Sequence, residues 1–218
     1  MRCICRSSSI AASVAVAVLA SGVALSVGMG TSPASGAQQD GQAKFDGVFS
    51  RDMTYVGNDE RGDAQWKKIQ EQVGKAAPDF AVGPWQSHNS AMQGGTIKSM
   101  RGEIVVVDFW GTWCPPCRKA MPKTTAMAKK YQSKGVRVVG VCNTRGSDTM
   151  METAEAHDGQ FAMAADLEDK TKKAYGVQWW PYYVVVDRDG IVRAAGLKSD
   201  KVETVVQRLL EIQPPREG

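Results

Sequence analysis

Residues 105–122, VVVDFWGTWCPPCRKAMP, contain two cysteines whose spacing predicts redox chemistry. Cys114 and Cys117 have the C-x-x-C spacing, which brings two thiols within reach of each other across one helical turn. Such a pair exchanges disulfides, because one thiolate attacks a substrate disulfide and the other thiol then resolves the mixed disulfide. We predict that Cys114 is the attacking residue and that Cys117 is the resolving one.

Asp108 is the third group in this stretch that can take part in chemistry. It shares a strand face with Val106 and Trp110 inside an apolar run. An isolated buried carboxylate is costly, and its pKa usually rises in response. Asp108 could instead be a strand-end residue that reaches solvent or a backbone N–H. The functional interpretation is a proton acceptor for Cys117 when that thiol must become a nucleophile.

The elements around Cys114 favour its reactive form. Residues 103–110, EIVVVDFW, are a continuous apolar run typical of a strand buried on both faces, and a helix is expected over residues 114–131 with a kink at Pro122. At the start of that helix, Cys114 faces unpaired N–H groups and the positive end of the helix dipole. Both favour a thiolate.

Two prolines separate the cysteines and bear on their redox properties. Pro115 and Pro116 fall in the first helical turn, where a missing N–H costs little because those donors have no helical partner. They also leave fewer N–H groups to stabilise Cys114. We therefore expect its thiolate to be stabilised less than the location alone predicts.

Periodicity along the rest of the chain predicts an α/β fold. Further strands are expected at residues 136–143 and 160–166, and a hairpin is expected over 182–196 with its turn at Asp189 and Gly190. Further helices are expected at 63–74, 147–158, 167–177 and 200–212. Asp63 is the expected cap of the first of these helices, and Ser147 or Asp148 that of the second. Residues 77–103 should be irregular, with one or two short strands that cover a sheet edge. The order predicts a mixed central β-sheet flanked by helices on both faces.

The start of the chain reads as an export signal. Arg2 and Arg6 precede an apolar run at residues 10–27, and small residues at 35–37 offer a cleavage site. An uncleaved membrane anchor is the alternative. We therefore assign residues 1–37 to a signal peptide, 38–62 to a flexible linker that gains order from about Phe45, and 63–218 to one domain with its core at about 74–212.

Composition supports one exported domain with redox chemistry. The chain has 218 residues, 43% of them hydrophobic, which suffices for one well-packed core. Its net charge of +4 falls to about +2 without residues 1–37, and no basic stripe supports a nucleic-acid partner. Three cysteines remain after the predicted cleavage, and an odd number with two in C-x-x-C favours chemistry over a structural disulfide framework.

The stretch DFWGTWCPPC closely resembles the active site of thioredoxin. Over roughly residues 74–212 the chain is similar to the exported thioredoxin-like thiol-disulfide oxidoreductases of the TlpA and ResA type. This resemblance implies a thioredoxin-like fold, a nucleophilic Cys114, a resolving Cys117 and a cis proline at Pro181 that faces them. In the family, the backbone before this proline pairs with an extended substrate segment, which suits protein or peptide disulfides.

The resemblance also implies a role and partners. It favours a reductant, for example for apocytochrome c or a copper-site assembly protein, which receives electrons from a membrane thiol carrier and needs no cofactor. We expect a monomer that is periplasmic or secreted. Asp108 matches thioredoxin itself better than the exported proteins.

Aromatic residues are dense around the cysteines and Pro181. The sequence has Trp179, Trp180, Tyr182 and Tyr183 around the proline, where the family more often has small residues or threonine. Tyr183 and Trp110 are expected in the core. Trp113 and Trp180 are the candidates for an exposed apolar rim that binds substrate.

Several other functions fit parts of the sequence. The pair could serve a general oxidant or isomerase, and Thr112 before Cys114 admits a thiol peroxidase. Reduced cysteines and ten methionines suit a copper-binding module, and Cys114, Cys117, Cys142 and His157 could form a zinc site on paper. The dithiol could also be inactive and structural. Cys142 by itself reads as a small buried apolar residue.

Overall fold

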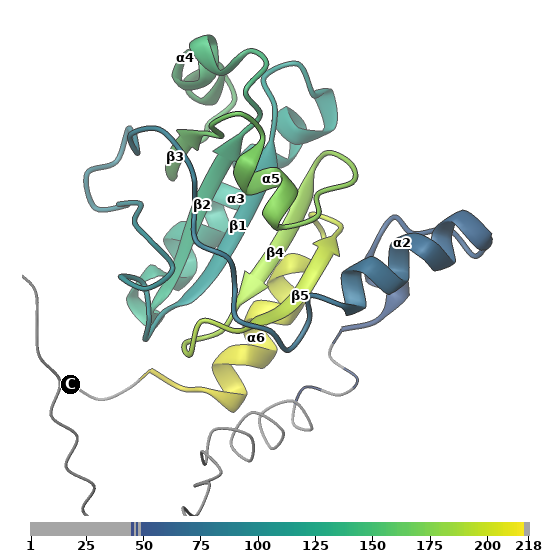
Figure 1. The fold of residues 1–218 in the computed structure, drawn as a ribbon. Helices are drawn as coiled ribbons and strands as arrows, with labels where there is room; N and C mark the ends of the chain where they lie inside the picture. Colours follow the sequence, from purple (N-terminus) through teal and green to yellow (C-terminus); the bar gives the residue numbers. More distant parts are fainter. Residues whose placement is uncertain (1–44, 46, 48, 216–218) are drawn as a thin grey trace, which may run out of the picture. The chain divides into compact units, whose positions relative to one another are not determined.

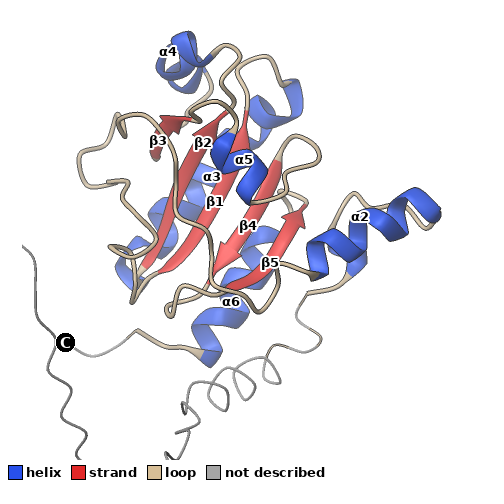
Figure 2. Cartoon of the chain, viewed as in Figure 1, coloured by secondary structure: helices blue, strands red, loops and turns tan. Residues whose placement is uncertain are grey.

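The centre of the fold is a five-stranded mixed β-sheet, as predicted (Figures 1 and 2). The computed structural model describes residues 45, 47 and 49–215 of the chain. The strands are β1 Ile104–Trp110, β2 Val136–Cys142, β3 Ala162–Ala165, β4 Tyr182–Val186 and β5 Val192–Leu197. They lie in the order β3-β2-β1-β4-β5. Strands β1, β2 and β3 are parallel, whereas β4 runs antiparallel to β1 and β5.

Helices connect the strands in the predicted order. The α-helices are α2 Glu60–Gln70, α3 Pro115–Tyr131, α4 Met150–Ala156, α5 Lys170–Ala174 and α6 Val202–Ile212, and short 3-10 turns are η1 Arg51–Met53, η2 Gln132–Lys134 and η3 Ser147–Thr149. Within the described part of the chain, no helix has the length and apolar character needed to cross a membrane. The predicted signal peptide lies outside the described residues.

Strand β1 separates two hydrophobic cores. Its even-numbered apolar residues pack with α3, α4 and α6, and its odd-numbered residues pack with α2 and with the segment that precedes β1. Helices therefore lie on both faces of the sheet, as predicted (Figure 1). Because side chains alternate along a strand, Asp108 points to the face that carries α3.

The start of α2 differs from the prediction. Asp59, and not Asp63, caps this helix, because Asp59 has an extended backbone and its side chain accepts a hydrogen bond of 2.7 Å from the N–H of Gly62. Asp63 lies inside the first turns and forms an ion pair of 2.6 Å with Arg51. The predicted cap fails because Asp59, four residues earlier, can also cap and already lies where the chain turns into the helix.

The start of α4 differs as well. This helix has Thr149 as its N-cap residue, without a side-chain bond, and η3 precedes it. The predicted cap Ser147 instead donates its hydroxyl to the carbonyl of Thr144 at 3.0 Å. The Ser147 side chain therefore stabilises the turn before the helix and does not cap the helix as predicted.

The segment before β1 covers sheet edges without forming strands of its own. Isolated bridges join Gln86 to Met163 of β3, Val82 to Asp166 and Ala76 to Ile191. The one or two short strands expected here are thus reduced to single bridges. The edge strand β3 is nevertheless paired on its outer side, which protects its backbone from other chains.

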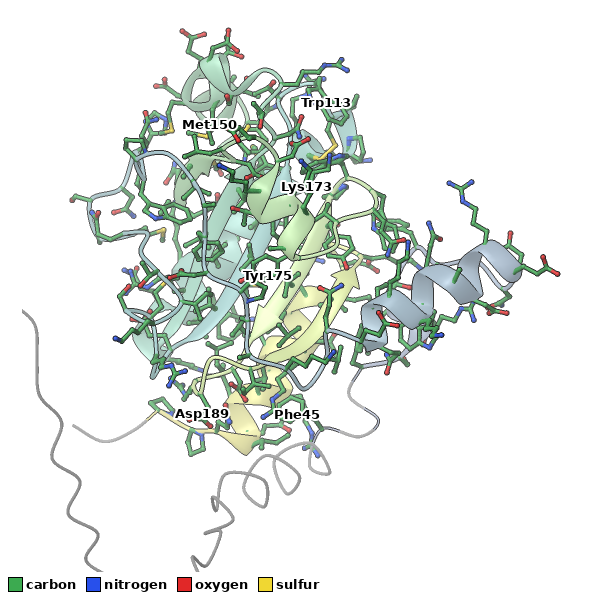
Figure 3. The ribbon with its side chains drawn as sticks, viewed as in Figure 1. Phe45, Trp113, Met150, Lys173, Tyr175 and Asp189 are labelled. Carbon is green, nitrogen blue, oxygen red and sulfur yellow. A yellow bond between two sulfur atoms is a disulfide. The ribbon has the colours of Figure 1, made fainter. Side chains whose placement is uncertain are left out.

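The hairpin between β4 and β5 turns where predicted. Gly190 adopts a left-handed conformation with φ of 77° and donates to the carbonyl of Asp187 at 2.9 Å. The buried Asp187 carboxylate accepts the N–H groups of Asp189 and Ile191 and pairs with the buried Arg193 at 2.7 Å. This turn lies at the opposite end of the sheet from Trp113 (Figure 3), so these buried charges hold the fold and take no part in the site.

Candidate active site

Cys114 and Cys117 form a disulfide at the junction of β1 and α3. Cys114 is the N-cap residue of α3, and its Sγ accepts a hydrogen bond of 3.2 Å from the N–H of Cys117. Pro115 and Pro116 occupy the first two helical positions, and neither has an N–H to donate. Of the first three helical residues, only Cys117 can therefore donate its N–H to the sulfur.

The turn that carries Cys114 is fixed by a neighbouring loop. The hydroxyl of Thr112 donates to the carbonyl of Gly146 at 3.1 Å, and the N–H of Cys114 donates to the carbonyl of Gly111 at 3.0 Å. Gly146 has φ of 81°, and a Cβ atom there would lie 2.2 Å from Oγ1 of Thr112. A glycine is thus needed where the two loops meet.

Asp108 is buried on the same side of the sheet as the disulfide. Only 1% of its surface is exposed, and its Oδ1 atom has no hydrogen-bond partner. Burial raises the pKa of Asp108 to about 7, and a hydrogen bond from Tyr183 partly opposes the rise. A carboxyl group with a pKa near neutrality can both take and release a proton, as a general base must.

Tyr183 is more than the core residue that the sequence predicts. It is buried, as expected, but its hydroxyl lies 3.2 Å from Oγ1 of Thr124 on α3. Burial and the negative charge of Asp108 raise the pKa of Tyr183 well above its usual value. Sequence reasoning missed this link because the strand register that places Tyr183 opposite Asp108 is a long-range property.

Two tryptophans form an aromatic edge beside the disulfide. Trp113 is 37% exposed, and its ring meets that of the half-buried Trp180 edge to face at 6.0 Å between centroids. Arg145 lies over Trp113 at 5.1 Å from the ring centroid, and Lys172 lies over Trp180 at 5.9 Å. We call these four residues the rim. The bond between Trp180 and Pro181 is cis, as the resemblance implies, and Pro181 is buried.

Cys142 is buried at the end of β2, as predicted. It is opposite Trp110 in the β1–β2 register, and burial raises its pKa to about 12. A thiol with so high a pKa is almost entirely protonated at neutral pH and is a poor nucleophile. Cys142 therefore takes no part in exchange in this geometry.

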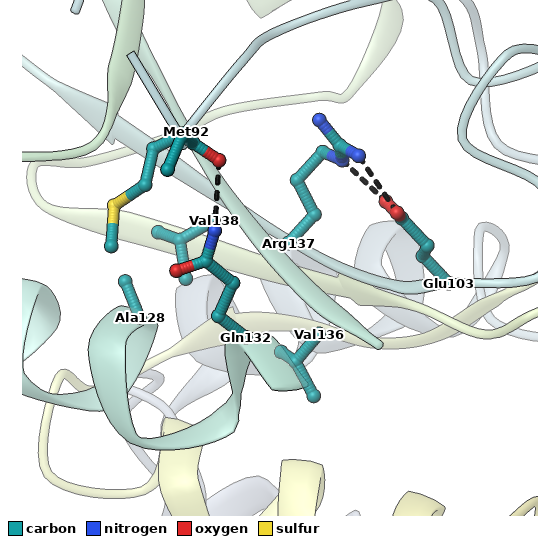
Figure 4. A pocket seen from close by; sticks show the side chains of 8 residues that line it. Met92, Glu103, Ala128, Gln132, Val136, Arg137 and Val138 are labelled. Carbon is teal, nitrogen blue, oxygen red and sulfur yellow. Dashed lines mark hydrogen bonds and ion pairs between the residues drawn. The ribbon is translucent and has the colours of Figure 1, made fainter. Parts of the chain in front are cut away.

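A small cavity lies away from the cysteines, and Figure 4 shows the residues that line it. It has a volume of about 50 Å³ and is bordered by Met92, Val136 and the ion pair of Arg137 with Glu103. Because β1 and β2 are parallel, the start of β2 at Val136 lies at the end of the sheet opposite Cys114. Ligand pockets usually have volumes of about 300–1,000 Å³, so this cavity is too small for a substrate. Over residues 49–215, no three His, Cys, Asp or Glu residues are grouped to hold a metal ion.

Known proteins are similar to this chain in sequence and in fold. Residues 73–195, which contain every site residue above, match the model of the AhpC/TSA family. The thiol-disulfide oxidoreductase ResA of Bacillus thuringiensis is 31% identical over 150 residues, which are 68% of this chain and 83% of that protein. ResA of Geobacillus thermodenitrificans is 29% identical over 148 residues, 68% and 82% of the two chains. The crystal structure of the thiol:disulfide interchange protein DsbE from Chlorobium tepidum aligns with a TM-score of 0.53 and 28% identity, covering 62% of this chain and 96% of that one.

Proposed function

The chain belongs to the AhpC/TSA family and is a thiol-disulfide oxidoreductase with a thioredoxin-like fold, and from this premise we propose that it reduces disulfides of exported proteins. Cys114 and Cys117 are the redox pair of this proposal, and Asp108 is its base. Trp113, Trp180 and Pro181 bind the substrate segment. A membrane thiol carrier returns the pair to the reduced state.

One observation supports the direction of exchange. The Cys114 sulfur receives one backbone N–H among the first three helical positions, because the other two are prolines. A thioredoxin-like protein is a strong oxidant, with a high reduction potential, when its reduced form with a charged thiolate is stabilised. Fewer donors leave the thiolate less stable, which lowers the reduction potential and favours a reductant.

The reaction proceeds by two exchanges. The Cys114 thiolate attacks a sulfur of the substrate disulfide, forming a mixed disulfide and releasing the other substrate sulfur as a thiolate. Asp108 takes the proton of Cys117, and the resulting thiolate attacks the Cys114 sulfur. The second substrate sulfur leaves as a thiolate, and the protein disulfide forms.

The setting of this chemistry is part of the proposal. The export signal predicted at residues 1–37 would deliver the domain, as a monomer, to the periplasm or the exterior. The similarity to ResA and DsbE favours substrates whose cysteines must be reduced before assembly, such as apocytochrome c or a copper-site protein.

The reduction potential of the Cys114–Cys117 pair tests the direction. We expect a value near that of thioredoxin, about −270 mV, in equilibration with glutathione or a reference dithiol. A value near about −120 mV would show an oxidant and end the reductant proposal.

Replacing Pro116 tests the physical cause. Pro116→Ala restores an N–H at the second helical position, where it can reach the capping sulfur. We expect the potential to rise by about 30 mV, as one added hydrogen bond to a thiolate implies. Pro122→Ala, in the same helix but beyond the first turn, is the matched control and should leave the potential unchanged.

The rim is tested by removing its most exposed ring. Trp113→Ala should raise KM for a protein disulfide by about tenfold and change kcat little, because the lost contact contributes to docking. Tyr55, which is 53% exposed and lies outside the rim, gives the control Tyr55→Ala with KM unchanged. Equal effects of the two substitutions would argue against a docking role for Trp113.

A further inference from the structure

Tyr183 and Asp108 lie opposite each other in the buried centre of the sheet. They are direct partners in the antiparallel register of β4 with β1. Such partners project to the same side of a sheet, with Cβ atoms about 5 Å apart. Each residue is only 1% exposed. Both side chains therefore lie on the α3 face of the sheet, in a place that water barely reaches.

The Tyr183 hydroxyl has one hydrogen and two competing acceptors. Oγ1 of Thr124 lies 3.2 Å from it and gives its own hydrogen to the carbonyl of Ala120 at 3.3 Å. Thr124 is thus left to accept. Asp108 is the second acceptor, because its Oδ1 has no hydrogen-bond partner, it lies opposite Tyr183 in the strand register, and its charged form is favoured by the Tyr183 hydroxyl. One hydrogen cannot satisfy both oxygens at once.

Few other groups can support a charge on Asp108. Cys142 from β2 and Tyr183 from β4 are the titratable groups that interact with it, and Cys117 of α3 lies on the same side of the sheet. Burial and Tyr183 account for the shifted pKa of Asp108, with no contribution from a cation in the described part of the chain. Its carboxylate thus depends on a neutral hydroxyl.

Given the function proposed above, we propose that Tyr183 is a positioning residue for the resolving step, with a hydroxyl hydrogen that alternates between Asp108 and Thr124. The hydrogen points to Asp108 while the carboxylate is charged, before it takes the proton of Cys117. When the S–H bond of Cys117 breaks and an O–H bond forms on Asp108, the hydrogen of Tyr183 turns to Thr124. Tyr183 keeps its own hydrogen throughout, and Cys117 proceeds to attack the Cys114 sulfur.

Two substitutions should move the pH profile of the resolving step in opposite directions. Tyr183→Phe removes the donor, so the midpoint should rise by about one pH unit. Thr124→Val removes the competing acceptor and keeps the shape of the side chain, so the midpoint should fall by about half a unit. The rate is measured by tryptophan fluorescence in a single turnover with a model protein disulfide.

An adjacent tyrosine supplies the matched control. Tyr182 lies on the same strand and packs in the other core, and its hydroxyl is buried away from Asp108. Tyr182→Phe should leave the midpoint where it is in the unaltered protein. A general loosening of the core would affect Tyr182→Phe and Tyr183→Phe alike. It would also not shift the midpoint in opposite directions in Tyr183→Phe and Thr124→Val.

Two results would overturn the inference. The first is an unmoved midpoint in Tyr183→Phe, and the second is a shift of the same sign in Tyr183→Phe and Thr124→Val. Should Tyr183→Phe not fold, the direction of the Thr124→Val shift decides. Asp108→Asn separates this inference from the proposed function. If Asp108→Asn removes the pH dependence and Tyr183→Phe does not move it, only the inference fails; if Asp108→Asn has no effect, the proposed base itself is wrong.

Discussion

Cys114→Ser should abolish disulfide exchange, with insulin reduction slowed by more than about 1,000-fold. A serine hydroxyl at neutral pH is almost fully protonated and forms no disulfide, so neither exchange step can occur. The N-cap position is compatible with serine, which itself caps helices well. The fold should therefore survive, as circular dichroism would show.

The other two cysteines provide the comparison for this result. Cys117→Ser keeps the attacking thiol but lacks the resolving one, and it should accumulate a mixed disulfide with the substrate that mass spectrometry detects. Cys142→Ala, at a buried position, should exchange disulfides at the normal rate. Insulin reduction that persists in Cys114→Ser would instead mark the dithiol as structural.

Asp108→Asn should make the protein more stable and less active. The carboxyl has a pKa of about 7 in the folded protein and an ordinary value of 3.8. Between these values the folded protein holds a proton that the unfolded chain has lost, so stability falls as pH rises from about 4 to about 7. The loss amounts to about 4 kcal/mol above pH 7.

Asparagine has the same shape but carries no charge at any of these pH values. The gain in stability of Asp108→Asn should therefore be small below about pH 4, grow through neutrality and level off above about pH 7. Urea unfolding of the oxidised protein at several pH values measures it. Asp148→Asn, at an exposed carboxylate, should follow the unaltered protein. A gain that does not vary with pH would show that Asp108 is not a buried titrating acid.

The loss of activity has a separate cause and its own readout. Without Asp108, Cys117 has no buried base to accept its proton, so resolution at neutral pH should slow by about 100-fold, a typical contribution of general base catalysis. The first attack by Cys114 should be little affected. Rapid quenching during a single turnover separates the two steps, and equal slowing of both would contradict this assignment.

Local sequence features predicted the part of the site that one segment builds. The apolar run at 103–110 and the residues that follow it specify β1, the capping Cys114 and the start of α3 without help from the rest of the chain. The turn at Gly190 is equally local. These features depend on backbone conformations that neighbouring residues determine.

The remaining features depend on contacts between distant segments. The bond from Thr112 to Gly146, the pairing of Tyr183 with Asp108 and the ion pair of Asp187 with Arg193 arise only when strands find their register. The prediction of the α2 cap was wrong for a different reason. Asp59 and Asp63 are both residues that cap helices well, and capping propensity alone does not choose between them. The rim was predicted from Trp113 and Trp180, but of its two cations Arg145 comes from the loop after β2 and Lys172 from α5.

The burial of both sulfur atoms determines which molecules can exchange electrons with this protein. Cys114 and Cys117 are 2% and 1% exposed, so a small thiol diffusing past meets almost no sulfur surface. Under the proposed function, a protein that docks on the rim supplies the contact needed to expose Cys114. The pair should therefore exchange only slowly with small thiols such as glutathione. Under the proposed function, its redox state is then set mainly by its electron donor and its protein substrates.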